Sequence, residues 1–182
     1  MSSVLEVKNI SKSFKDYSSE FKRILSWFGF DFKPIEEHHI LKHINFSIAP
    51  GEAVGIVGQN GAGKSTTMMI LTTLLKPTSG VALISGFDVS TNPKQVRENI
   101  GYVQQESTVD EYLTGRENLL LQAKLNHIPK NEINKRIDDV LELIELVDKQ
   151  DQAVVTYSGG MRKRLDIAGG LLHRPKVLFL DE

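Results

Sequence analysis

Gly58-Gln59-Asn60-Gly61-Ala62-Gly63-Lys64-Ser65 is the stretch that decides the fold of this chain. It matches G-x-x-x-x-G-K-[ST], the pattern of a phosphate-binding P-loop. Residues 53–57 before it are predicted to form a short buried strand, and residues 66–75 after it a helix. A strand, a glycine-rich loop and a helix in this order are the context that the motif requires.

The residue types of this loop suit a phosphate chain. Glycines allow successive backbone N–H groups to turn inward toward an anion, and the start of the following helix adds free N–H groups and a positive dipole end. Lys64 can bridge the β- and γ-phosphates, and Ser65 can bind Mg²⁺. The loop therefore predicts a site for a nucleotide with Mg²⁺.

Composition describes an ordinary globular chain. The sequence has 182 residues, a formal net charge of -1, 40% hydrophobic and 25% charged residues, and no cysteine. The absence of cysteine excludes a disulfide framework and thiol-ligated metal sites. The N-terminus lacks the apolar region of a signal peptide, and no stretch approaches the ~20 apolar residues needed to cross a bilayer. If the protein serves a membrane, we expect it to do so through a partner.

Further strands and helices follow from periodicity and capping. Thr114 and Glu117 form a capping-box pair ahead of a helix over 118–125, and Ser158 is placed to cap a helix over 160–172. A helix that starts near Asn131 keeps a 3.6-residue apolar period. Its apolar positions are Ile133, Ile137, Val140, Leu141, Ile144 and Val147. The predicted strands are 4–10, 40–48, 80–84, 99–103 and 177–180.

The segment 15–39 stands apart from this pattern. Phe21, Ile24, Leu25 and Phe28 share one face at helical spacing, with basic residues among them. One interpretation is a peripheral insertion that packs on the domain's own surface. The other is an amphipathic helix that lies against a membrane surface or a membrane partner.

Three further elements narrow the nucleotide chemistry. The strand 177–180 leads into Asp181 and Glu182, the Walker B pattern, in which Asp181 would hold Mg²⁺ through water and Glu182 would polarise the attacking water. Gln105 follows a predicted strand and could reach Mg²⁺ or that water. Taken singly, the Walker B pattern is also compatible with an ordinary buried strand that ends in acids, and Gln105 with an ordinary polar loop residue.

The third element is a second anion-binding helix terminus. Ser158, Gly159 and Gly160 precede or begin a helix. One chain does not need two such sites for one γ-phosphate, but two chains that face each other head to tail would use both. The plainer interpretation is a helix cap with a flexible lead-in.

The order of these elements resembles the nucleotide-binding domain of ABC transporters. Walker A, a Q-loop at Gln105, a signature at 158–161 and Walker B follow one another in that family's order. The resemblance covers nearly all of 1–182 apart from 15–39, and it implies a helical subdomain near 106–151. Within the family, 110–119 and 157–166 look most like the daunorubicin-resistance type of exporter ATPase. The signature departs from the commoner Leu-Ser-Gly-Gly-Gln in Tyr157 and Met161.

The resemblance implies an α/β fold with a P-loop NTPase parallel sheet core, an N-terminal antiparallel β layer and the helical subdomain. It implies Glu182, Lys64 and Gln105 as catalytic residues, and Ser65, Gln105 and Asp181 as Mg²⁺ ligands. Phe14 would stack on adenine, with Tyr17 as the alternative. The ATP-binding residues that it implies are Phe14, Gly58, Gln59, Asn60, Gly61, Ala62, Gly63, Lys64, Ser65, Thr66, Ser158, Gly159 and Gly160.

The partners implied are a second nucleotide-binding domain in a homodimer and a separate ABC-2 type permease. The chain would then be cytoplasmic, on the inner face of the cell membrane, and nucleic acid would not be a partner. Two alternatives stay open: a soluble ABC ATPase that acts on ribosomes or nucleic acid, and a truncated fragment that does not hydrolyse ATP. No residue indicates the cargo.

The sequence stops at Glu182, before the D-loop, the switch histidine and the last core strands that the resemblance implies. We therefore expect a truncated chain that turns over little ATP alone. The five histidines all precede Asp181 and are interpreted as surface or loop residues. A basic cluster is interpreted as a solvated helix face; its members are Arg162, Lys163, Arg164, Arg174 and Lys176.

Overall fold

The computed structural model describes residues 3–16 and 36–181. The chain folds into two compact units, 1–93 and 94–182. Among the described residues, none of the helices has both the length and the apolar character needed to span a lipid bilayer.

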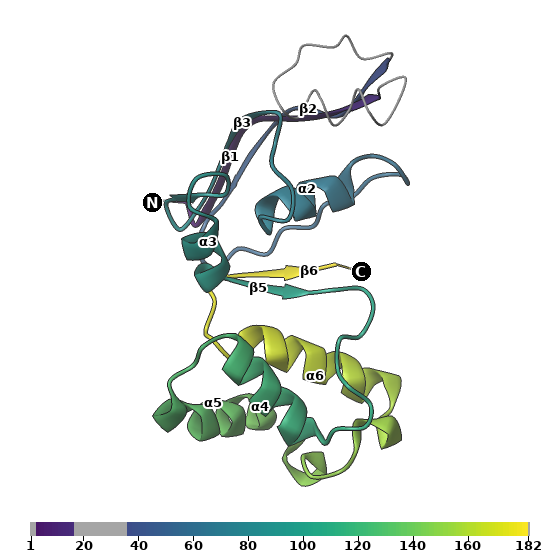
Figure 1. Cartoon of the computed structure of the whole chain (residues 1–182), viewed down its shortest axis with the longest axis vertical. Coiled ribbons are helices and arrows are strands. Elements are labelled where there is room, and N and C mark those ends of the chain that lie inside the picture. Colours follow the sequence, from purple (N-terminus) through teal and green to yellow (C-terminus); the bar gives the residue numbers. More distant parts are fainter. Residues whose placement is uncertain (1–2, 17–35, 182) are drawn as a thin grey trace. The chain divides into compact units, whose positions relative to one another are not determined.

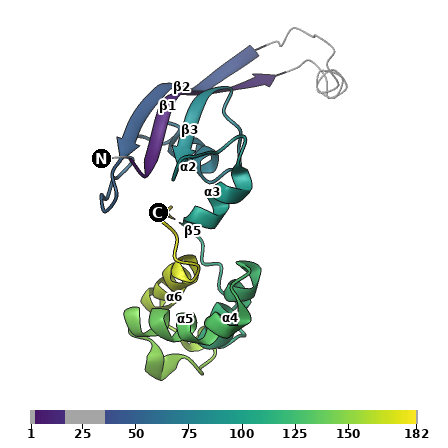
Figure 2. The same cartoon turned by 90° about the vertical axis from the view of Figure 1, so that its left-hand side faces the viewer.

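The first unit is built on an antiparallel sheet with strand order β2-β1-β3-β4 (Figures 1 and 2). Its strands are β1 (Leu5–Asp16), β2 (Glu36–Ile48), β3 (Ser79–Ile84) and β4 (Phe87–Asp88). Leu5 on the central strand lies opposite Ile48 on one side and Ile84 on the other. The antiparallel layer predicted from sequence is thus confirmed, and both β1 and β2 are longer than predicted.

Side chains along β1 alternate between the buried and the more exposed face of this sheet. Leu5 and Val7 are buried, whereas Glu6 and Lys8 between and after them are not. The tight turn from β3 to β4 uses Ser85 and Gly86, both at positive φ (52° and 84°), as two-residue hairpins require.

Helix α2 (Lys64–Leu71) follows the P-loop, as predicted, and ends four residues earlier than expected. Its buried side chains are Thr67, Ile70 and Leu71. The strand predicted over 53–57 is wrong, because these residues have no regular secondary structure and pair with no strand among the described residues. Val57 is 96% exposed, and without a neighbouring strand its segment has no ladder of hydrogen bonds to hold it extended.

The second unit joins a small parallel sheet to a bundle of helices (Figure 1). Strands β5 (Ile100–Val103) and β6 (Val177–Leu180) pair in parallel, so both predicted strands are confirmed. The helices are α3 (Pro93–Asn99), α4 (Gly115–Leu125), α5 (Lys130–Leu143) and α6 (Gly159–Leu171), with short 3₁₀ turns at Val147–Lys149 and Val154–Thr156.

One hydrophobic core unites α4, α5 and α6. Four of the predicted apolar positions of α5 are buried, and Ile144 just beyond it is buried too, but Val147 is 46% exposed because the helix has already ended. The core contains Leu119, Ala123, Ile128, Ile133, Ile137, Val140, Leu141, Ile144, Leu146, Val154, Tyr157, Leu165, Ala168 and Leu172.

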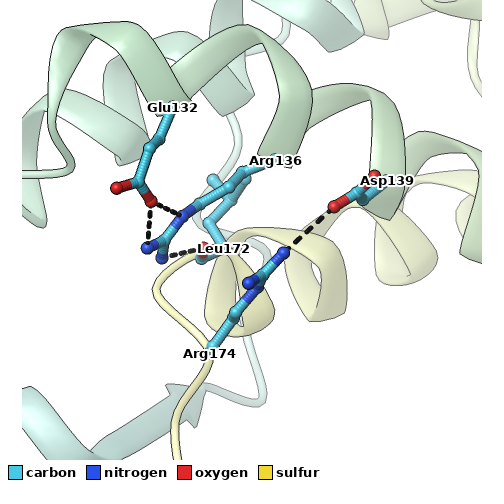
Figure 3. A network of polar contacts seen from close by, with 5 residues as sticks. All are labelled: Glu132, Arg136, Asp139, Leu172 and Arg174. Atoms are coloured by element: carbon cyan, nitrogen blue, oxygen red, sulfur yellow. Dashed lines mark hydrogen bonds and ion pairs between the residues drawn. The ribbon is translucent and has the colours of Figure 1, made fainter.

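Two arginines tie α5 to the end of α6 (Figure 3). Arg136 donates from Nε and Nη2 to Oε2 of Glu132 (3.0 and 2.6 Å) and from Nη1 to the carbonyl oxygen of Leu172 (3.2 Å). Arg174 pairs with Asp139 at 3.2 Å. Positive charge at a helix C-terminus satisfies its open carbonyls and opposes its dipole, so these contacts stabilise the turn from α6 toward β6.

Candidate functional site

The P-loop in the first unit has the backbone that its sequence predicts. Gly61 and Gly63 adopt left-handed conformations, with φ of 83° and 86°. At Gly63 a Cβ would also lie 2.5 Å from Cδ2 of Leu41, so both conformation and space require glycine there. The residues from Gln59 to Ala62 and Ser65 are exposed, which leaves the loop open to a ligand.

The Lys64 side chain folds back onto the carbonyl groups of the loop. Its Nζ donates to the carbonyl oxygens of Gly58 (2.6 Å) and Gln59 (3.0 Å). Helix α2 has no side-chain cap at Gly63, so its first N–H groups are open to an acceptor. An ammonium group beside open backbone donors at a helix N-terminus is suited to bind phosphate oxygens.

The signature in the second unit is an ordered helix start. Oγ of Ser158 accepts a hydrogen bond from the backbone N–H of Met161 (3.2 Å), which confirms the predicted cap. A Cβ added at Gly159 or Gly160 would meet no atom within 4 Å among the described residues. The helix start is therefore exposed and has space in front of it.

Tyr157, which replaces the commoner leucine, anchors this helix start. It is 4% exposed, and its hydroxyl donates to the carbonyl oxygen of Lys149 (2.7 Å). Burial, followed by the nearby Asp151 carboxylate, raises the pKa of Tyr157. A Cβ on Gly115 would collide with the tyrosine hydroxyl, so glycine at the start of α4 makes room for the ring.

Asp181 lies at the end of β6 beside Tyr102 of β5. The Tyr102 hydroxyl is 3.2 Å from Oδ2 of Asp181, and the backbone N–H of Asp181 donates to Val103 (3.0 Å). Partial burial, then the Asp181 carboxylate, raises the pKa of Tyr102, which keeps the phenol a hydrogen-bond donor. Glu182, the predicted base, lies outside the described residues.

Gln105 is exposed in a bend just after β5. Close to it in sequence, Thr108 donates from its backbone N–H (3.0 Å) and its hydroxyl (2.9 Å) to Oδ1 of Asp166. Asp166 is a buried carboxylate in the middle of α6, and sequence reasoning missed it. An acid among apolar residues on the inner face of an amphipathic helix was the available signal.

The adenine-stacking prediction remains a prediction. Phe14 lies in β1, 44% exposed, with Nζ of Lys12 5.0 Å from its ring centroid. Tyr17 and most of the segment 15–39 lie outside the described residues.

Two interpretations of charged residues gain detail from the structure. His173 lies in a turn as expected, and its ring is partly buried, with Nε2 2.7 Å from the carbonyl oxygen of Ile100. The members of the basic cluster are exposed or partly exposed, and two of them also contact neighbouring segments: Arg162 pairs with Glu111 at 2.6 Å, and Arg164 donates to the carbonyl oxygen of Ile144 at 2.9 Å. These long side chains thus also join α6 to neighbouring segments.

The predicted site residues are divided between the two units. The P-loop belongs to 1–93, and Gln105, Ser158 and Asp181 belong to 94–182. Asp181 and Ser65 offer hard oxygen ligands of the kind that Mg²⁺ prefers. Within the part of the chain that the structure describes, no three His, Cys, Asp or Glu side chains gather as a metal site.

Comparisons with known proteins agree with this set of elements. The sequence model of the family described as ABC transporter matches residues 41–182. The chain is 44% identical over 142 residues to the doxorubicin resistance ATP-binding protein DrrA of Mycobacterium tuberculosis, covering 78% of this chain and 43% of the relative. It is 42% identical over 146 residues to the daunorubicin resistance ATP-binding protein DrrA2 of Streptomyces coeruleorubidus, covering 80% and 45%.

A solved structure shares the fold. The dimeric structure of a post-hydrolysis state of the ATP-binding cassette MJ0796, bound to ADP and Pi, matches with a TM-score of 0.72 and 27% identity, over 98% of this chain and 73% of that chain. The chain spans less than half the length of the two DrrA relatives.

Proposed function

Because this chain belongs to the ABC transporter family, we propose that it binds ATP with Mg²⁺ and hydrolyses the nucleotide to energise a membrane exporter. The observation that carries the proposal is the P-loop: left-handed glycines, an uncapped helix start, and Lys64 within bonding distance of the loop carbonyls. The names of the DrrA relatives, which are drug-resistance ATP-binding proteins, support an exporter.

In the proposed mechanism, Lys64 leaves its loop carbonyls and binds the β- and γ-phosphates, while backbone N–H groups at the start of α2 bind the remaining oxygens. Ser65, Gln105 and Asp181 would hold Mg²⁺, which offsets the charge that develops on the phosphoryl group. Glu182 would accept the proton of the attacking water.

A second copy completes the proposed site. Ser158, Gly159 and Gly160 would close over the γ-phosphate bound to the facing copy, and their open surface supports this role. The dimeric, ADP- and Pi-bound state of the structural relative supports a homodimer. We place the ABC-2 type permease against the helical region near 106–151, which would hold the protein at the inner face of the cell membrane.

Titration of the protein with a fluorescent ATP analogue tests the proposal. Wild type should bind saturably with Mg²⁺, and Lys64→Ala should weaken binding by roughly tenfold or more, since charge-assisted bonds to phosphate are lost. Lys42→Ala, which removes an exposed lysine of β2, is the matched control and should bind as wild type does. Unchanged affinity in Lys64→Ala would refute the nucleotide assignment.

Co-purification tests the proposed partner. A membrane subunit recovered with the tagged protein supports the exporter, whereas ribosomes or DNA recovered in its place would overturn it.

A further inference from the structure

The second unit contains a cavity of about 270 Å³ that the proposed ATPase mechanism does not use. It lies between β5, α4 and α6, and all of its lining residues belong to 94–182. Its apolar wall includes Ile100, Val103, Val109, Leu119 and Leu165.

A buried carboxylate oxygen without a partner lines this cavity. Asp166 is 7% exposed, and its Oδ1 accepts both hydrogen bonds from Thr108. Its Oδ2 has no hydrogen-bond partner among residues 3–16 and 36–181. Because an unsatisfied buried acceptor is costly, a donor that enters the cavity and reaches Oδ2 would be bound favourably.

His173 supplies a second acceptor at the same cavity. Its Nε2 faces the carbonyl oxygen of Ile100, which can only accept, so Nε2 carries the hydrogen and Nδ1 of the neutral ring is an acceptor. Nδ1 likewise has no partner in the described part of the chain. His173 lies in the turn just after α6, and both it and Asp166 line the cavity.

The charge of the lining selects a cation. Asp166 is the one acidic residue among the described lining residues, and no lysine or arginine is among them. From this combination we propose that the cavity binds a small organic cation: an ammonium group at Asp166, an apolar body along the wall, and a hydrogen-bond donor at the far end for His173.

Tyramine has an ammonium group, an apolar body and a hydroxyl donor at the far end, and two chemical analogues of it each lack one of these groups. Phenethylamine lacks the hydroxyl, and para-ethylphenol lacks the ammonium group. The Thr108 amide donates directly to Asp166, so its NMR signal reports on this end of the cavity, and the Thr67 amide in α2 serves as the internal control.

We expect tyramine to shift the Thr108 amide saturably, with a millimolar or lower dissociation constant, and to leave Thr67 unshifted. Para-ethylphenol should bind roughly tenfold more weakly, because a charge-assisted hydrogen bond is lost, and phenethylamine should fall between the two. Asp166→Asn should remove the preference for the charged probe. Lys64→Ala should leave binding unchanged, which separates this cavity from the nucleotide site.

Absence of saturation with tyramine, or equal binding of tyramine and para-ethylphenol, would overturn the proposal. The three probes are compared on the wild-type protein, so this comparison tests the preference for a cation even if Asp166→Asn fails to fold.

Discussion

The hydroxyl of Tyr102 donates a hydrogen bond to Oδ2 of Asp181 across the parallel β5–β6 pair, at 3.2 Å. The contact orients the carboxylate that we assign to Mg²⁺ and occupies one of its two oxygens. Tyr102 would therefore act as a positioning residue in the proposed ATPase.

Tyr102→Phe removes that hydrogen bond and keeps the ring. The Mg²⁺ concentration for half-maximal MgATP binding should rise several-fold, in line with the ~1 kcal/mol of a typical hydrogen bond. Nucleotide binding in EDTA should not change, which separates positioning from general damage. Tyr112→Phe, at a tyrosine that is 90% exposed, is the control. An unaltered Mg²⁺ dependence would show that Asp181 needs no such partner.

Ser158→Ala and Thr114→Ala each delete a helix cap, from α6 and α4 respectively. Urea titration should show a loss of about 1 kcal/mol in the free energy of unfolding for each variant. Only Ser158→Ala should also weaken ATP-driven dimerisation, measured by light scattering in a Glu182→Gln background. Equal dimerisation by the two variants would mean that Ser158 is a cap and nothing more.

Gly169→Ala and Gly115→Ala should act in opposite directions. A Cβ on Gly169 in α6 meets only Cγ of Gln122 at 3.5 Å, an ordinary contact, so alanine should stabilise the fold by about 0.5–1 kcal/mol. A Cβ on Gly115 collides with the hydroxyl of Tyr157, and alanine there should destabilise by about 1–3 kcal/mol. Denaturant midpoints measured side by side check both signs.

Helix α5 ends without the usual glycine. Glu145 has φ of 57°, and the N–H groups of Glu145 and Leu146 return to the carbonyls of Glu142 (3.1 Å) and Leu141 (3.0 Å), a Schellman arrangement. Glu145→Gly should therefore raise the free energy of unfolding by about 0.5–1 kcal/mol, since the left-handed backbone strains a side chain. The exposed Arg164–Glu145 pair that it removes contributes little.

Glu142→Gly is the matched control for Glu145→Gly, because Glu142 is also exposed but lies inside α5. It should lower stability by about 1 kcal/mol, the usual cost of glycine in a helix. Destabilisation by both substitutions would contradict the strain argument.

The capping box of α4 should confer a pH dependence. Hydrogen bonds from the Thr114 backbone N–H and then from its side chain hold the pKa of Glu117 below its ordinary value of 4.5. A lowered pKa means stabilisation that is present above the unfolded-state pKa and is lost as pH falls through the folded-state pKa. The difference in Tm between wild type and Glu117→Gln should thus narrow below about pH 4.5. A constant difference across this range would exclude the linkage.

Elements that depend on near neighbours in sequence were predictable. Three such elements are the P-loop turn, the cap at Ser158 and the Thr114–Glu117 capping box. Each involves residues within a few positions of one another, so its pattern can be recognised in the sequence. Alternating and helical periods likewise placed β1, β2, β3, β5 and β6 and the core face of α5, apart from Val147 beyond its end.

What only the tertiary structure decided are the long-range pairings. Tyr102 contacts Asp181, which lies 79 positions away, and Thr108 contacts Asp166, which lies 58 positions away. The sequence around one residue of each pair contains no signal that identifies the other. The predicted strand at 53–57 failed for the same reason, since an extended segment becomes a strand only when another strand supplies its hydrogen bonds. Local patterns depend on backbone geometry a few residues long, whereas pairings across the fold depend on the path of the whole chain.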